Sequence, residues 1–292
     1  MVMIVYGHTS NEFTEVLAKY HLGFLLESGR FATGVFLFLS GYGLTLSIKR
    51  NIIDGSYIRR HLQKLLLPYF TFWMFYFLIG FLCGFPSTQN NICIDFIFLK
   101  MPNVDTWFFR TILVLYVLYF SLARYLKTYA GIGIAVIIFA YITILIYYEV
   151  SSWWWNTIMC FPVGILYANF PALCRKMPFV YLVGLGALFV FLHKFLPVYH
   201  IGAICAPIIL CLICAYLSTI FFVPYKVPIL TFIGINSLYM YFMETIPIDY
   251  LNSAEVGFAI YISGGIGITI ALTYLGKFIE TYVKKCFTHW QN

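Results

Sequence analysis

Residues 65–84 read LLLPYFTFWMFYFLIGFLCG, twenty consecutive positions without a charged side chain. The hydrocarbon core of a bilayer is about 30 Å thick, and an α-helix needs about 20 mainly apolar residues to cross it. The stretch therefore predicts a transmembrane helix, and this prediction decides the fold class of the chain.

The composition of the whole chain agrees with that stretch. Hydrophobic residues make up 62% of the 292 positions and charged residues only 10%, whereas a soluble domain carries about 25% charged residues. So few charges cannot cover a water-facing surface, which excludes a soluble enzyme and a disordered scaffold. The net charge of +7 does not indicate nucleic acid as a partner, because the basic residues lie between apolar runs and form no continuous face.

Nine apolar runs are long enough for full spans. An apolar fragment, Met1–Gly7, precedes them and is too short to cross a bilayer. It has no basic region or cleavage site of a signal peptide, so we interpret it as the end of a truncated first helix. The predicted fold is an all-α transmembrane bundle with nine full spans plus this helix, ten in the intact architecture. The runs are 31–48, 65–84, 106–122, 129–148, 153–169, 178–193, 203–223, 229–248 and 257–276.

The distribution of Lys and Arg predicts the orientation of these spans. If the first helix starts in the cytoplasm, thirteen basic residues fall on inner segments and four on outer segments, as the positive-inside rule requires. We therefore expect a multi-pass protein with a cytoplasmic C-terminus. No linker or repeat divides the sequence, so residues 1–292 are interpreted as one domain.

The eight cysteines do not indicate a metal or redox site. Most lie within apolar runs, where cysteine behaves as a small hydrophobic residue. Cys211 and Cys214 form one C-x-x-C pair, but no second pair accompanies it. We therefore predict no metal.

Ionisable side chains inside a bilayer are costly and are functional candidates. His8 ends the truncated helix, Arg110 lies one turn into the run that begins near 106, and Glu244 lies one turn before the end of the run 229–248. The predicted orientation places all three near the outer face. Together they could form a general-base site with a charge clamp. Alternatively, each could extend to the outer headgroups, as side chains near helix ends often do.

The densest basic patch, YIRRHLQKLLLPY over residues 57–69, leads into the run 65–84. Arg60 and Lys64 are four residues apart and share a helix face, and Arg59 lies beside them. Such a pair suits the phosphates of a cytoplasmic ligand. The alternative is that the patch only sets orientation and contacts anionic lipids. Charge alone favours this alternative.

The order of several motifs resembles acyltransferase family 3, the integral-membrane O-acyltransferases that modify bacterial surface polysaccharides and other extracytoplasmic acceptors. A histidine, His8, precedes the segment Gly34–Tyr42, which reads GVFLFLSGY. The basic run into Pro68 and Tyr69 follows, then Trp107 and Phe108, and finally GINSLYMY at 234–241. The resemblance extends over the whole chain.

The resemblance implies an enzyme of the bacterial inner membrane that transfers an acyl group from acyl-CoA to a polysaccharide or glycolipid hydroxyl. Acetyl-CoA is the donor that we expect. It implies His8 as catalytic base or transient acyl carrier, with Glu244 and Arg110 as further catalytic residues. Arg59, Arg60 and Lys64 would bind the donor phosphates. Ser40, Trp107 and Tyr241 are the substrate-binding candidates that it adds.

Three positions depart from the family pattern. Only seven residues precede His8, so an arginine that the family carries further upstream is absent, and we expect the start of the first helix to be missing. Glu244 stands where the family has a histidine. Lys64 replaces an arginine, which keeps the charge but loses bidentate binding.

A protein of another class could use the same buried charges. A transporter or flippase for a lipid-linked sugar or small acid would place them along a substrate pathway. It would need neither acyl-CoA nor a histidine beside an acceptor.

Overall fold

The computed structural model of the chain describes residues 28–51, 53–83, 106–170, 179–195, 200–218, 228–253 and 258–289, together with Phe96 and Leu99. Within these ranges the regular structure is helical and contains no strand. The predicted all-α class is confirmed.

Five of the predicted runs form helices long and apolar enough to cross a bilayer. This supports a multi-pass membrane protein, but nine full spans are not confirmed. The five helices are α3 (Ser28–Arg50), α4 (Gly55–Cys83), α6 (Trp107–Leu126), α7 (Ala130–Tyr147) and α11 (His200–Leu217).

Two further runs form shorter helices, α8 (Cys160–Asn169) and α10 (Phe179–Phe195). The prediction of a helix starting near 153 is wrong. Residues Ser152–Trp154 form a single 3₁₀ turn, and the Trp155 indole donates to the Val150 carbonyl at 3.0 Å. The backbone before Cys160 therefore follows this turn instead of an α-helix, and α8 begins only at Cys160.

The last two runs form α12 (Pro228–Met243), α13 (Thr245–Ser253) and α14 (Phe258–His289). The predicted helix over 229–248 is therefore interrupted at Glu244. Residues 258–276 of the run 257–276 lie within α14, which continues for about three further turns.

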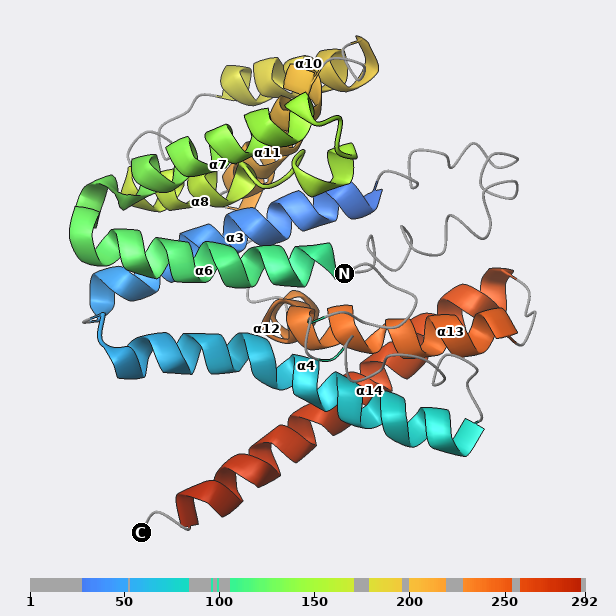
Figure 1. Cartoon of the computed structure of the whole chain (residues 1–292). Helices are drawn as coiled ribbons and strands as arrows, with labels where there is room; N and C mark the ends of the chain where they lie inside the picture. The colour runs from blue at the N-terminus through green and yellow to red at the C-terminus, as the bar shows by residue number, and fades with distance from the viewer. Residues whose placement is uncertain are drawn as a thin grey trace. The chain divides into compact units, whose positions relative to one another are not determined.

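The chain divides into two compact units (Figure 1). Unit 1 comprises Met1–Gly29, Arg59–Arg110 and Pro228–Asn292, and unit 2 comprises Arg30–Ile58 and Thr111–Val227. In the described part, unit 1 contains most of α4, the first turn of α6, and α12 to α14. The interpretation of the chain as one domain stays a prediction.

In unit 2, glycines allow α3 and α8 to approach closely. A Cβ atom at Gly41 would clash with the Phe161 carbonyl oxygen, and one at Gly164 would clash with the Phe38 carbonyl oxygen. Small residues of this kind let the backbones of membrane helices pack together. The Gly34–Tyr42 motif thus has a structural role in α3.

The two helices also run in the same direction. Gly34, early in α3, lies beside Cys160 at the start of α8, whereas Lys49, late in α3, donates to the Ala168 carbonyl at 2.9 Å. The predicted alternation of spans requires runs 31–48 and 153–169 to be parallel. The observed direction agrees with this alternation.

Helix α7 ends at a residue with left-handed backbone. Glu149 has φ 53°, Val150 N donates to the Leu145 carbonyl at 2.9 Å, and Glu149 N donates to the Ile146 carbonyl at 3.0 Å. This is a Schellman cap, in which glycine is the usual residue at the left-handed position.

In unit 1, an aromatic cluster holds α4 against α6 and α12. Tyr69 is fully buried and stacks on Phe109 at 5.1 Å between ring centroids. Phe242 packs edge-on against both rings, at 5.8 Å from Tyr69 and 4.9 Å from Phe109. These contacts position the ends of α6 and α12 described next.

Candidate active site

The first turn of α6 carries Trp107 and Arg110. The Thr106 hydroxyl donates to the Leu99 carbonyl at 2.7 Å, and Arg110 N donates to the Thr106 carbonyl at 3.2 Å. Thr106 is fully buried, whereas Trp107 and Arg110 are half-buried. The start of the helix, and with it the arginine, is therefore held in place.

The last turn of α12 packs against this turn of α6. Phe108 meets the Tyr241 ring edge-on at 5.3 Å, and Phe109 meets Phe242 at 4.9 Å. Tyr241, a predicted substrate-binding residue, is buried. It lies in the contact between the two turns.

Glu244 follows this turn and occupies the break between α12 and α13, where its side chain has 0% exposure. The break has a local cause in Pro247, because proline has no N–H to donate to the Met243 carbonyl and its ring crowds that oxygen. A buried carboxylate is costly unless a cation or hydrogen-bond donors stabilise it. Arg110 is carried by the first turn of α6, which packs against the last turn of α12 just before Glu244.

The three basic donor-site candidates lie in the first turns of α4. Arg59, Arg60 and Lys64 are all exposed. Tyr57, seven residues before Lys64 and therefore on the same side of the helix, is buried. The helix has 29 residues, which corresponds to about 43 Å at 1.5 Å per residue. This length exceeds the roughly 30 Å of a bilayer core, so the helix is long enough for its basic first turns to extend beyond the hydrocarbon.

Asp54 fixes where α4 begins. Its carboxylate accepts hydrogen bonds from the Tyr57 backbone N–H at 2.6 Å and from the Ser56 hydroxyl at 2.9 Å. This is the N-cap arrangement, in which a side chain satisfies the first backbone donors of a helix. The cap sets the start of the helix at Gly55, four residues before Arg59.

Two predicted residues remain, Ser40 and His8. Ser40 is half-buried in α3 of unit 2, where its side chain faces Tyr116 of α6. His8 lies outside the described residues. The structure therefore brings together the turns that carry Trp107, Arg110, Tyr241 and Glu244, and leaves the predicted roles of all these residues as predictions.

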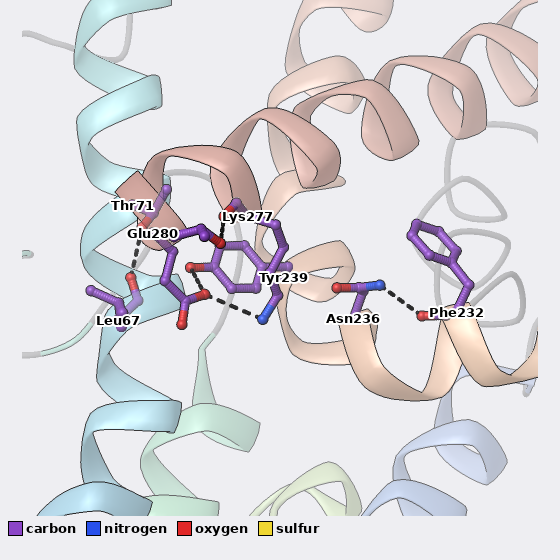
Figure 2. A network of polar contacts seen from close by, with 8 residues as sticks. Leu67, Thr71, Phe232, Asn236, Tyr239, Lys277 and Glu280 are labelled. Atoms are coloured by element: carbon purple, nitrogen blue, oxygen red, sulfur yellow. Dashed lines mark hydrogen bonds and ion pairs between the residues drawn. The ribbon is translucent and has the colours of Figure 1, made fainter. Parts of the chain in front are cut away.

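The sequence reasoning missed a polar network between α12 and α14 in unit 1 (Figure 2). The Tyr239 hydroxyl donates to Glu280 Oε2 at 2.8 Å, and Lys277 Nζ lies 3.2 Å from the same oxygen. The ammonium also lies over the Tyr239 ring, 4.6 Å from its centroid. The three-residue spacing of Lys277 and Glu280 was the available signal, but nothing local indicated Tyr239.

Clusters of three or more metal-ligating side chains are absent from the part of the chain that the structure describes. In the same part, Cys211 and Cys214 are free thiols.

Long apolar helices that enclose buried polar and charged side chains define a polytopic membrane protein. The model of the family described as an acyltransferase domain matches residues 1–277. The chain therefore belongs to acyltransferase family 3 and is a membrane acyltransferase. No curated protein and no solved structure matches the chain.

Proposed function

We propose that the protein transfers an acyl group, in the simplest case acetyl, from cytoplasmic acyl-CoA to a hydroxyl of a cell-surface polysaccharide or lipid-linked sugar. It would act in the bacterial inner membrane with its C-terminus in the cytoplasm. The observation that carries the proposal is that Arg59, Arg60 and Lys64 are exposed on α4 and belong to the same unit as the buried Glu244.

The donor side of the proposal rests on charge and exposure. Acyl-CoA carries several phosphates, and exposed guanidinium and ammonium groups form charge-assisted hydrogen bonds with phosphate. Arg60 and Lys64 share a helix face and are both exposed. This face is therefore accessible to a phosphorylated ligand from the aqueous side.

The reaction needs a base, because an acceptor hydroxyl is a weak nucleophile until its proton is removed. In the proposal His8 takes that proton, the acceptor oxygen bonds to the thioester carbonyl carbon, and the carbon–sulfur bond breaks. The leaving thiolate of CoA receives the proton. Arg110 and Glu244 would supply opposite charges near the reacting groups, with Ser40, Trp107 and Tyr241 as acceptor contacts.

Family membership favours this enzyme over the transporter alternative. Purified protein incubated with radiolabelled acetyl-CoA and candidate glycan acceptors tests the proposal. The expected result is label in the acceptor together with one free CoA thiol per acyl group transferred. Movement of a lipid-linked sugar across proteoliposomes without acetyl-CoA, and with no label transferred, would support the transporter instead.

A further inference from the structure

The network of Tyr239, Lys277 and Glu280 lies directly beside a close contact of α14 with α4 and α12. A Cβ atom at Gly276 would lie 3.1 Å from a Tyr239 ring carbon and 3.3 Å from the Thr71 methyl. Helices α4, α12 and α14 therefore pack closely at Gly276, where a larger side chain would require Tyr239 or Thr71 to shift. Lys277 is the next residue of α14, and its side chain is 36% exposed.

Thr71 connects this contact to the basic face of α4. Residues 60, 64, 67 and 71 follow a four-three-four spacing, so their side chains form one stripe along the helix. Lys64 is seven residues before Thr71, which is about 10 Å along the axis. In Figure 1 the N-terminal end of α4 and the C-terminal end of α14 both extend to the left of the place where they cross. Lys64 precedes Thr71 on α4 and Lys277 follows Gly276 on α14, so each lies toward that end of its helix.

The position of the Lys277 ammonium is defined by two neighbours. Glu280 attracts it at 3.2 Å, and the Tyr239 ring lies below it at 4.6 Å. Glu280 is in turn held by the Tyr239 hydroxyl and is only 11% exposed. An ammonium group has three hydrogen-bond donors, so the pair with Glu280 leaves capacity for an anionic ligand.

The simpler interpretation is an ordinary pair three residues apart on a helix, which contributes little to stability. Such a pair forms between two exposed side chains and needs no third residue. Here a buried tyrosine from a second helix fixes the carboxylate, and the carboxylate and ring together fix the lysine. Holding a long side chain in one geometry lowers the entropy lost when it binds a ligand.

We propose that Lys277, positioned by Glu280 and Tyr239, binds the phosphates of the acyl donor together with Arg60 and Lys64. The inference rests on the proposed acyl-CoA donor and adds α14 to its binding site. In this arrangement Lys277 contacts the ligand, whereas Glu280 and Tyr239 are positioning residues.

The test measures equilibrium binding of CoA and of pantetheine, which lacks phosphates, to the purified full chain in detergent. We expect Lys277→Gln to weaken CoA binding about 10-fold, the loss of one charged contact, and to leave pantetheine binding unchanged. Lys277→Arg should retain most of the CoA affinity. Tyr239→Phe and Glu280→Gln should weaken CoA binding about 3-fold, again without an effect on pantetheine. Lys127→Gln, at an exposed lysine between α6 and α7, is the matched control.

Unchanged CoA affinity in Lys277→Gln, with a loss in Arg60→Ala, would overturn this inference and leave the proposed donor intact. Equal losses for CoA and pantetheine would also overturn it, because they would indicate a distorted site. Failure of the unsubstituted protein to bind CoA would overturn the proposed donor, and this inference with it.

Discussion

Thr45 and Tyr119 are 74 residues apart, yet their hydroxyl oxygens lie 2.9 Å apart in unit 2. Thr45 uses its own proton to donate to the Gly41 carbonyl at 2.8 Å, so Tyr119 is the donor between the two side chains. This bond joins α3 to α6. The buried Thr45 hydroxyl thus uses both its donor and an acceptor position for hydrogen bonds.

Two threonine-to-valine substitutions should change stability in opposite directions. Thr45→Val leaves the Tyr119 hydroxyl without its acceptor and should cost about 1–3 kcal/mol. Thr273 is fully buried in α14 and its hydroxyl has no hydrogen-bond partner, so Thr273→Val should gain about 1 kcal/mol. Thermal unfolding in detergent measures both. A loss of stability in Thr273→Val would contradict this prediction, because it would show that the Thr273 hydroxyl forms a hydrogen bond in the folded protein.

Gly41→Ala should destabilise the protein by about 1–3 kcal/mol, because the added methyl group overlaps the Phe161 carbonyl. Gly43 lies two residues further along α3 and has nothing within 4 Å of a Cβ atom. Gly43→Ala is therefore the control and should be neutral or stabilising, since alanine favours helix. The yield of folded protein and its Tm report the difference. Equal Tm values for the two variants would contradict the close α3–α8 contact.

Glu149→Gly should raise Tm. A residue other than glycine in the left-handed conformation costs about 1 kcal/mol, and Glu149 has φ 53°. Glu149→Ala keeps this strain and serves as the control. If both variants gain equally, the effect comes from removing the carboxylate rather than from the backbone.

His8→Ala should abolish acyl transfer while the protein still inserts into membranes, because no other residue replaces the base in the proposed reaction. His200→Ala is the control at an exposed histidine, whose ring lies 5.4 Å from that of Trp155. The measurement is transfer of radiolabelled acetyl groups at matched protein levels. Near-normal transfer by His8→Ala would exclude the assignment.

Arg60→Ala and Lys64→Ala should each raise the KM for the acyl donor by about 10- to 150-fold, because one charged contact to phosphate is worth about 1.5–3 kcal/mol. Gln63 is exposed between them, and Gln63→Ala is the neutral control. A donor titration at equal membrane protein levels separates phosphate binding from lipid contact. Lipid contact alone leaves the KM unchanged and lowers insertion or stability.

Long uncharged runs predicted helices correctly where the run itself determines the structure. Residues 65–83 of the run 65–84 lie within α4, and the run 129–148 closely matches α7, because length and hydropathy suffice to define such helices. The break at Glu244 required attention to Pro247, whose effect is local and visible in the sequence. Helix α8 begins at Cys160 and not near 153, because a turn forms between Val150 and Trp155. Hydropathy alone does not predict such a turn.

The site was less accessible to sequence reasoning because it depends on contacts between distant segments. The spacing of Arg60 and Lys64 predicted a shared face, and both side chains are exposed on α4. By contrast, no periodicity relates Phe108 to Tyr241, or Tyr239 to Glu280. These pairs arise from the packing of α6 on α12 and of α12 on α14.

The parallel contact of α3 with α8 has a consequence for biogenesis. Lys49 and its partner Ala168 are separated by 119 positions, which a ribosome translates in about 6 to 24 seconds at 5–20 residues per second. During that interval α3 has been synthesised, while the helix that covers its glycines has not. The Gly41 surface of the nascent chain therefore lacks its native partner until α8 is made.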